Sequence, residues 1–129
     1  MGSSMAEQRA GCRGVGLDLC EIVRMEKLLE NDRFLSRFFT EGEAAYIRAG
    51  GKASAQRMAG IFAAKEAFSK SIGTGIAFEL REVEVKHEAS GQPYYAFSGE
   101  AERLAGTDRF FLSISHDGGI AAAVCIREG

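Results

Sequence analysis

Three absences narrow what this 129-residue chain can be. Its three cysteines, Cys12, Cys20 and Cys125, are an odd number without CxxC spacing, which argues against a disulfide framework and a thiolate zinc site. No apolar run approaches the roughly 20 residues that cross a bilayer. The chain also lacks the positive excess of a dedicated nucleic-acid binder, because 16 basic residues face 18 acidic ones. We therefore expect a soluble, cytoplasmic protein with no membrane or nucleic-acid partner.

The first residues look like the remnant of an expression tag. Met1-Gly2-Ser3-Ser4 precedes a second methionine, Met5, which we take as the native start. We expect residues 1–11 to be a tag remnant and a flexible N-terminus without the apolar centre of a signal peptide. Residues 12–129 have the length of a single domain.

Hydrophobic periodicity predicts helices mainly in the first half and strands mainly in the second. Helical spacing indicates helices over about 21–30, after Asn31, over about 41–49 behind a Thr40–Glu43 capping box, and over 54–72. Alternation indicates strands near 13–19, 83–88, 93–98, 110–116 and 120–126, with a helix from Ser98 to Ala105. There is no regular βαβ alternation and no internal repeat. The predicted fold class is therefore α+β, with helices packed on a small antiparallel sheet.

The helix predicted over 54–72 carries an acid among small residues. At about 100° per residue, Ala59, Ala63, Glu66 and Lys70 share one stripe, so that a ligand or a backbone can approach closely. The opposite face is apolar and is expected to pack in the core. One helix would thus contribute side chains both to the hydrophobic core and to a functional site.

A second acid lies on a similarly bare face. Asp18 alternates with glycines along the first predicted strand. A pair formed by Asp18 and Glu66 would suit Mg²⁺, which keeps much of its hydration and also binds phosphates. Lys65, Lys70 and the amides of residues 73–75 would complement those phosphates. The ordinary alternative is an i,i+4 surface pair of Glu66 with Lys70, and an Asp18 that merely ends a strand.

Four segments match one family in order. They are residues 14–24 (GVGLDLCEIVR), residues 62–75 (FAAKEAFSKSIGTG), residues 91–93 (GQP) and residues 113–116 (SISH). Together they resemble the holo-acyl-carrier-protein synthases, which are short 4′-phosphopantetheinyl transferases. The resemblance implies transfer of the phosphopantetheine arm of coenzyme A to a serine of apo acyl carrier protein, releasing adenosine 3′,5′-bisphosphate, in fatty-acid biosynthesis. It also implies Mg²⁺ dependence and a homotrimer with sites between subunits.

The resemblance also implies roles for individual residues. Asp18 and Glu66 would hold Mg²⁺ against the pyrophosphate, while Lys65 and Lys70 would neutralise phosphate charge. The serine proton could pass to Glu66, to a metal-bound water or to Lys70 after deprotonation, and we favour Glu66, directly or through water. Glu66 and Lys70 are therefore the candidate catalytic residues.

Further positions match those that touch the ligand or the carrier in the family. Ser69, Gly73 and Thr74 would contact the nucleotide part of coenzyme A. His116 would reach the nucleotide of a neighbouring subunit's ligand, or else make only a local hydrogen bond. Arg24 matches the family arginine expected to meet the carrier. Charge alone adds three residues to the docking surface, namely Lys27, Arg33 and Arg37.

One position departs from the family pattern. Ile61 stands where relatives commonly have arginine, and Arg57 lies one helical turn earlier. His87 shares a face with two valines and is expected to be a partly buried structural residue. Two other functions remain open at this point: a noncatalytic coenzyme A or nucleotide-binding module of the same fold, and a structural oligomerisation domain.

Overall fold

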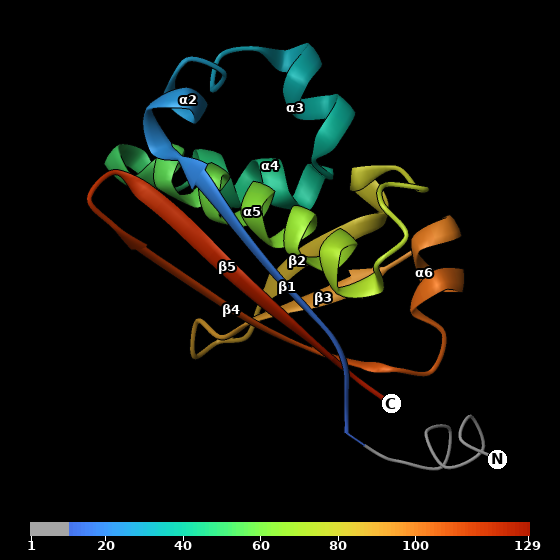
Figure 1. The fold of residues 1–129 in the computed structure, drawn as a ribbon. Coiled ribbons are helices and arrows are strands. Elements are labelled where there is room, and N and C mark those ends of the chain that lie inside the picture. The colour runs from blue at the N-terminus through green and yellow to red at the C-terminus, as the bar shows by residue number, and fades with distance from the viewer. Residues whose placement is uncertain (1–10) are drawn as a thin grey trace, which may run out of the picture.

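The computed structural model describes residues 11–129 (Figure 1). The expected tag remnant and flexible N-terminus lie outside these residues, apart from Gly11. Within the described range, no helix is long and apolar enough to cross a membrane. In chain order the elements are β1 Cys12–Glu21, α2 Ile22–Glu26, α3 Asp32–Phe38, α4 Glu41–Arg48, the 3₁₀ turn η1 Gly51–Ala53, α5 Ser54–Ile72, the 3₁₀ turn η2 Leu80–Glu82, β2 Val83–His87, β3 Pro93–Phe97, α6 Gly99–Ala105, β4 Arg109–Asp117 and β5 Ile120–Glu128.

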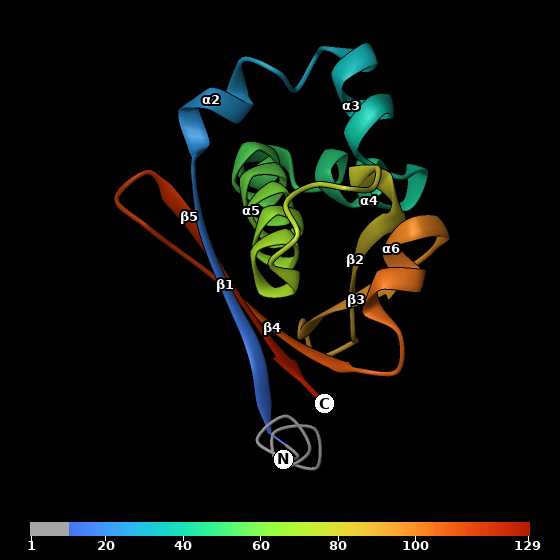
Figure 2. The same cartoon turned by 45° about the vertical axis from the view of Figure 1, so that its right-hand side comes forward.

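Helix α5 runs through the middle of the fold. Figure 2 shows it between strands β1, β5 and β4 on one side and α4 with β2 and β3 on the other. Strands β1, β5 and β4 form one antiparallel sheet in that order, and β2 and β3 form a second, two-stranded one. The α+β class is confirmed, but the single sheet of the prediction is two sheets. Alternation identifies strands without saying which of them pair, and here α6 separates the two hairpins in the chain.

The two sheets bury α5 on nearly all sides. Its fully buried side chains include Met58, Ala63 and Phe68. The ring of Phe68 packs against the aromatic rings of Phe78, Tyr95, Phe97 and Phe110, with centroids 4.7–5.8 Å apart. The expected division of α5 into a core face and a site face is therefore only partly correct. Glu66 is half-buried and Lys70 is exposed, and Lys70 reaches solvent beside β1.

The glycines of β1 face α5 and permit an unusually close approach. A Cβ built at Gly16 would lie 1.7 Å from the carbonyl oxygen of Ala67, and one at Gly14 would lie 2.1 Å from that of Ser71. Only glycine fits at these two positions without moving the strand away from the helix. Asp18 follows Gly16 on the same face, because side chains alternate along a strand.

The other face of this sheet is apolar and exposed. Val15, Leu17 and Leu19 are 57%, 57% and 63% exposed, and Phe111 and Ile126 are also exposed. The register joins three of them in one row, since Ile126 of β5 pairs with Val15 of β1 and with Phe111 of β4. This outer sheet face is a contiguous apolar surface of the kind that marks protein interfaces.

Local capping signals set several element boundaries. The Thr40–Glu43 capping box forms as predicted, with the Glu43 amide donating to the Thr40 hydroxyl at 3.1 Å and the Thr40 amide donating to the Glu43 carboxylate at 2.9 Å. Ser98 precedes α6 but makes no side-chain cap bond. Glu82 accepts the amide of Ala101 instead, at 3.2 Å, so a distant carboxylate replaces the predicted local cap.

Candidate active site

The structure brings Asp18 and Lys70 together and places Glu66 beside them. Lys70 Nζ lies 3.1 Å from Oδ1 of Asp18 and donates to the carbonyl oxygen of Leu17 at 3.0 Å. Lys70 therefore pairs across to β1 rather than with Glu66 along its own helix. The Lys70 side chain is 56% exposed and that of Asp18 is 19% exposed, so this pair can be reached from solvent.

The pKa of Glu66 reports the surroundings of this carboxylate. Burial raises it above its ordinary value, and the negative charge of Asp18 raises it further, while the cations of Lys70 and Arg24 oppose the rise. Two carboxylates that repel each other in a half-buried position fit a shared divalent cation. Among the described residues, no group of three or more His, Cys, Asp and Glu side chains gathers at one point. Asp18 and Glu66 are thus the two carboxylates here that could hold a cation, and such a pair would suit one that keeps its waters.

Lys65 does not belong to this cluster. Its side chain is 0% exposed, and Nζ lies 2.8 Å from Oε1 of Glu43. It also donates to the carbonyl oxygens of Leu80 and Val83, at 2.9 and 2.7 Å. An ammonium has three donors, and all are used. The expectation that Lys65 contacts phosphate therefore requires correction, because in this fold the side chain points into the core.

The predicted nucleotide contacts lie at the C-terminal end of α5. Gly73 takes a left-handed conformation with φ of 82° and its amide donates to the carbonyl oxygen of Ser69 at 3.2 Å. The side chain of Thr74 is exposed one residue later. Ser69 is only 4% exposed, so of the two hydroxyls only that of Thr74 is open to a ligand.

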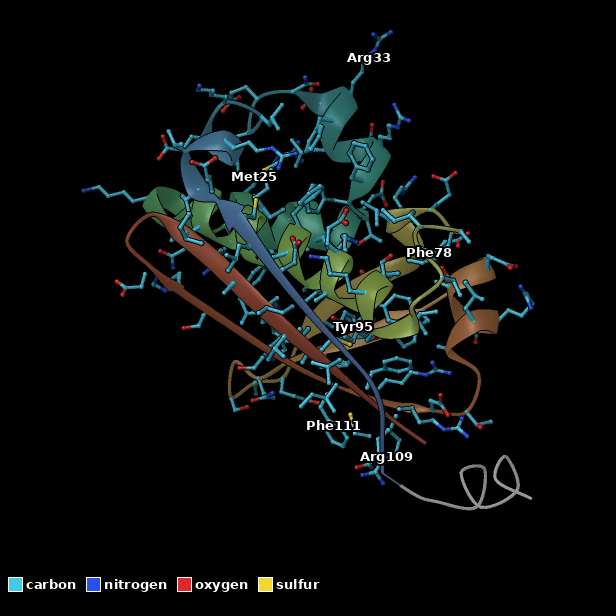
Figure 3. All side chains as sticks on the ribbon, in the orientation of Figure 1. Met25, Arg33, Phe78, Tyr95, Arg109 and Phe111 are labelled. Carbon is cyan, nitrogen blue, oxygen red and sulfur yellow. The ribbon has the colours of Figure 1, made fainter. Side chains whose placement is uncertain are left out.

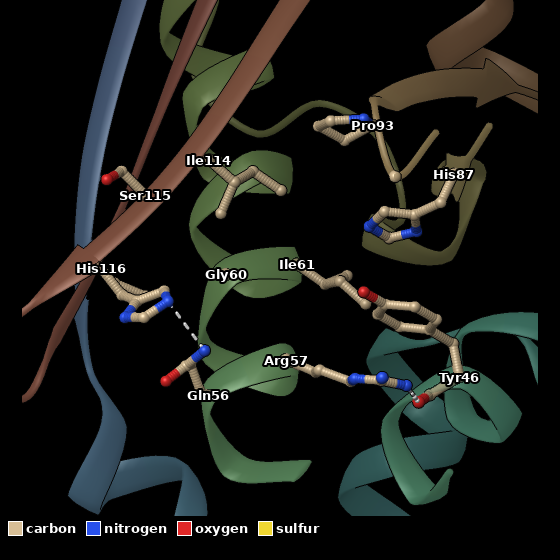
Figure 4. Close-up of a pocket in the computed structure, with 12 residues that line it drawn as sticks. Tyr46, Gln56, Arg57, Gly60, Ile61, His87, Pro93, Ile114, Ser115 and His116 are labelled. Atoms are coloured by element: carbon tan, nitrogen blue, oxygen red, sulfur yellow. Dashed lines mark hydrogen bonds between the residues drawn. The ribbon is translucent and has the colours of Figure 1, made fainter. Parts of the chain in front are cut away.

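His116 lies elsewhere in the chain, at the rim of a cavity of about 200 Å³ (Figure 4). Its Nε2 is 2.9 Å from Nε2 of Gln56, near the start of α5. Gln56 precedes Glu66 by ten residues, which is about 15 Å along a helix axis. A single chain thus does not bring His116 to the carboxylates.

Sequence reasoning missed most of this cavity. Arg57 donates to the carbonyl oxygen of Tyr46 at 2.7 Å and its guanidinium lies 4.2 Å from the centre of the Tyr46 ring. The imidazole of His87 stacks on Tyr46 at 4.2 Å, and burial together with the Arg57 charge lowers its pKa. Ile61 is buried at the cavity wall beside Arg57. The sequence had singled out parts of this lining separately, in the segments 91–93 and 113–116 and in the pair Arg57 and Ile61, without indicating that they meet. His87 is half-buried, as predicted.

The candidate docking residues lie on α2 and α3, apart from Lys27, which directly follows α2. All four are exposed, namely Arg24, Lys27, Arg33 and Arg37. Arg24 stands over the ring of Phe62, 5.5 Å from its centre, which places its cation beside α5 one turn before Glu66. Figure 3 shows Arg33 pointing outward from α3. The surface is therefore available, and its partner remains a prediction.

The fold and its charged cluster of Asp18, Glu66 and Lys70 define a small α+β domain with a candidate active site beside β1. The chain belongs to the 4′-phosphopantetheinyl transferase superfamily, whose family model matches residues 14–125. The holo-[acyl-carrier-protein] synthase of Treponema denticola is 38% identical over 120 residues, which cover 90% of this chain and 98% of that protein. That of Geobacter sp. strain M21 is 41% identical over 122 residues, covering 89% and 97%. The expected family is confirmed.

Solved structures agree with this assignment. The holo-(acyl-carrier-protein) synthase of Bacillus anthracis in complex with CoA (3′,5′-ADP) is 35% identical, with a TM-score of 0.77 over 93% of this chain and 98% of that one. The Helicobacter pylori synthase in complex with coenzyme A is 29% identical, with a TM-score of 0.75 over 88% and 98%. The predicted fold is thereby confirmed.

Proposed function

We propose that this protein is a holo-acyl-carrier-protein synthase, which transfers the 4′-phosphopantetheine arm of coenzyme A to a serine of apo acyl carrier protein. The observation that carries the proposal is the meeting of Asp18, Glu66 and Lys70 beside β1 and α5. The coenzyme A complexes of two relatives support the donor. The names of the curated relatives support the acceptor. We infer a cytoplasmic role in fatty-acid biosynthesis.

The reaction exchanges one P–O bond for another. The serine oxygen attacks the β-phosphorus of the coenzyme A pyrophosphate, the bond to the bridging oxygen breaks, and adenosine 3′,5′-bisphosphate leaves with the bond's electron pair. Glu66 accepts the serine proton, directly or through water. Asp18 and Glu66 would hold Mg²⁺, which when bound stabilises the charge that develops on the leaving group.

Two further groups bind the anionic donor. The exposed ammonium of Lys70 offers positive charge beside the carboxylates. The hydroxyl of Thr74 offers a hydrogen-bond donor just after the end of the same helix. Gly73 permits the left-handed turn that brings Thr74 there.

The outer sheet face supports assembly into the homotrimer that the family resemblance implies. An apolar surface that includes Val15, Leu17 and Phe111 is costly to leave in water and suits a second copy of the chain. Gln56, which His116 contacts, lies about 15 Å along α5 from Glu66, so an interface would let His116 complete a neighbour's site instead. We accordingly place His116 at the nucleotide of the adjacent subunit.

The intact mass of an apo acyl carrier protein provides the test. After incubation with this protein and coenzyme A, the carrier should gain one phosphopantetheine arm with Mg²⁺ and none with chelator. Glu66→Gln should abolish the gain while leaving the fold intact by circular dichroism. If several carriers gain no mass although coenzyme A binds, the protein is a noncatalytic coenzyme A-binding module and the proposal fails.

A further inference from the structure

The buried pair of Glu43 and Lys65 joins four parts of the fold. Lys65 Nζ reaches Oε1 of Glu43 and the carbonyl oxygens of Leu80 and Val83, at 2.7–2.9 Å. Oε2 of Glu43 accepts the amide of Val85 at 2.7 Å. Both side chains are 0% exposed. Helices α4 and α5, turn η2 and strand β2 are thus tied at one point inside the protein.

Two of these bonds fix the path of the chain after α5. Leu80 begins η2 and Val83 begins β2, so Lys65 holds the far end of the segment over residues 73–82. The near end of this segment carries Gly73 and Thr74. Residues 73–77 are all exposed, and the core does not hold them. Their position against α5 therefore depends on where the segment is anchored.

The same pair also restrains the rotation of α5 about its axis. Glu66 follows Lys65 directly, so a roll of the helix that moves one side chain moves the other. A side-chain atom about 6 Å from the helix axis travels about 1 Å for a roll of about 10°. Asp18 is on β1, which does not roll with α5. A small rotation would therefore change the separation of the two carboxylates.

We propose that Glu43 and Lys65 are positioning residues for phosphopantetheine transfer, which hold Glu66 against Asp18 and hold the 73–82 segment against α5. Neither residue touches the substrate, and both act through the residues that they orient. The inference rests on the proposed function for its catalytic consequence. Its structural consequence, the anchoring of residues 73–82, can be measured without turnover.

The test compares Glu43→Gln with a control on the same helix. Glu43→Gln preserves side-chain size and removes the charge that faces Lys65. Ile47→Ala also opens a defect at a fully buried position of α4, but Ile47 has no bond to the pair. All measurements are made at a temperature at which circular dichroism shows each variant to be folded. We expect kcat of Glu43→Gln to fall by roughly 10- to 100-fold, and amide exchange over 73–82 to accelerate. Ile47→Ala should keep the wild-type kcat and the wild-type exchange over 73–82, despite a lower melting temperature.

Several results would overturn the proposal. An unchanged kcat in folded Glu43→Gln, or an equal loss in Ile47→Ala, would reduce the pair to a general contribution to stability. If Glu43→Gln does not fold, the double replacement Glu43→Gln with Lys65→Met removes both charges, and it should fold better while kcat stays low. Recovery of kcat there would refute the inference. If the wild-type protein transfers no phosphopantetheine arm, the proposed function fails. Amide exchange alone then decides whether the pair anchors residues 73–82. Unchanged exchange over this segment in Glu43→Gln refutes the anchoring.

Discussion

Replacing Gly16 with alanine tests the packing that places Asp18. The new Cβ would lie 1.7 Å from the carbonyl oxygen of Ala67, whereas real Cβ atoms stay beyond 3.0 Å of such a neighbour. Strand β1 must therefore move from α5 by at least about 1.3 Å, the difference between these distances. Asp18 lies two residues further on the same face and would move with the strand. Because a misplacement of about 1 Å can cost about 100-fold in rate, we expect a loss of that order in transfer, with about 1–3 kcal/mol lost from the free energy of unfolding.

Two other glycines supply the controls for this prediction. Gly14→Ala creates a clash of 2.1 Å with Ser71, four residues from Asp18, so it should lower stability and reduce transfer less than Gly16→Ala. A Cβ at Gly42 on α4 would lie 3.0 Å from a carboxylate oxygen of Glu84 and 3.8 Å from the Thr40 hydroxyl, side-chain contacts that a small shift relieves, so Gly42→Ala should keep both transfer and stability. Transfer is followed by the carrier's intact mass and stability by denaturant unfolding. A Gly16→Ala protein with wild-type stability and rate would refute the close approach of β1 to α5.

Three further predictions concern assembly, pH and docking. Leu17→Lys should lower the mass measured by light scattering toward that of one chain, and an unchanged mass would exclude the outer sheet face from the interface. Arg57→Met should raise the pKa of His87 in an NMR titration, because burial and the Arg57 charge lower it from 6.5. A lowered folded-state pKa means that the stability from neutral His87 is present above 6.5 and is lost as the pH falls through the folded-state value. Arg57→Met should therefore lose less stability on acidification, and equal acid sensitivity would contradict this. Arg24→Glu should raise KM for an acidic carrier roughly tenfold and raise KM for coenzyme A less, because Arg24 also lies near Glu66, and an equal rise in both would argue against docking at Arg24.

Features encoded by neighbouring residues were predictable from the sequence. The bounds of α5 match the expected 54–72, because glycines precede and follow an apolar periodic segment. The Thr40–Glu43 box has both partners within four residues. The juxtaposition of Asp18 and Glu66 was reached differently. Both acids lie on faces otherwise lined by glycine or alanine, which suggested that they share a site, and the family resemblance implied the same pairing.

Features that depend on tertiary packing were not predictable in the same way. Glu43 is recognisable in the sequence as a capping residue, yet nothing near it indicates that its carboxylate also meets a buried ammonium. Lys65 and Lys70 looked equivalent as phosphate ligands, but only the position of the two sheets around α5 decides which of them reaches solvent. The cavity at His116 likewise draws its walls from α4, α5, the two sheets and the β2–β3 turn, so no single segment signals it.

The two lysines of α5 differ in their exposure to solvent, and this difference sets how easily each can change its partner. Lys70 and Asp18 form a partly exposed pair, a type worth about 0–1 kcal/mol, so a phosphate or a cation can replace either partner at little cost. Lys65 and Glu43 are fully buried, and removing one partner leaves an uncompensated charge at a cost of about 3–5 kcal/mol. The first pair can therefore open at little cost, whereas opening the second is costly. A helix that carries both can hold Glu66 in place while Lys70 changes partners beside it.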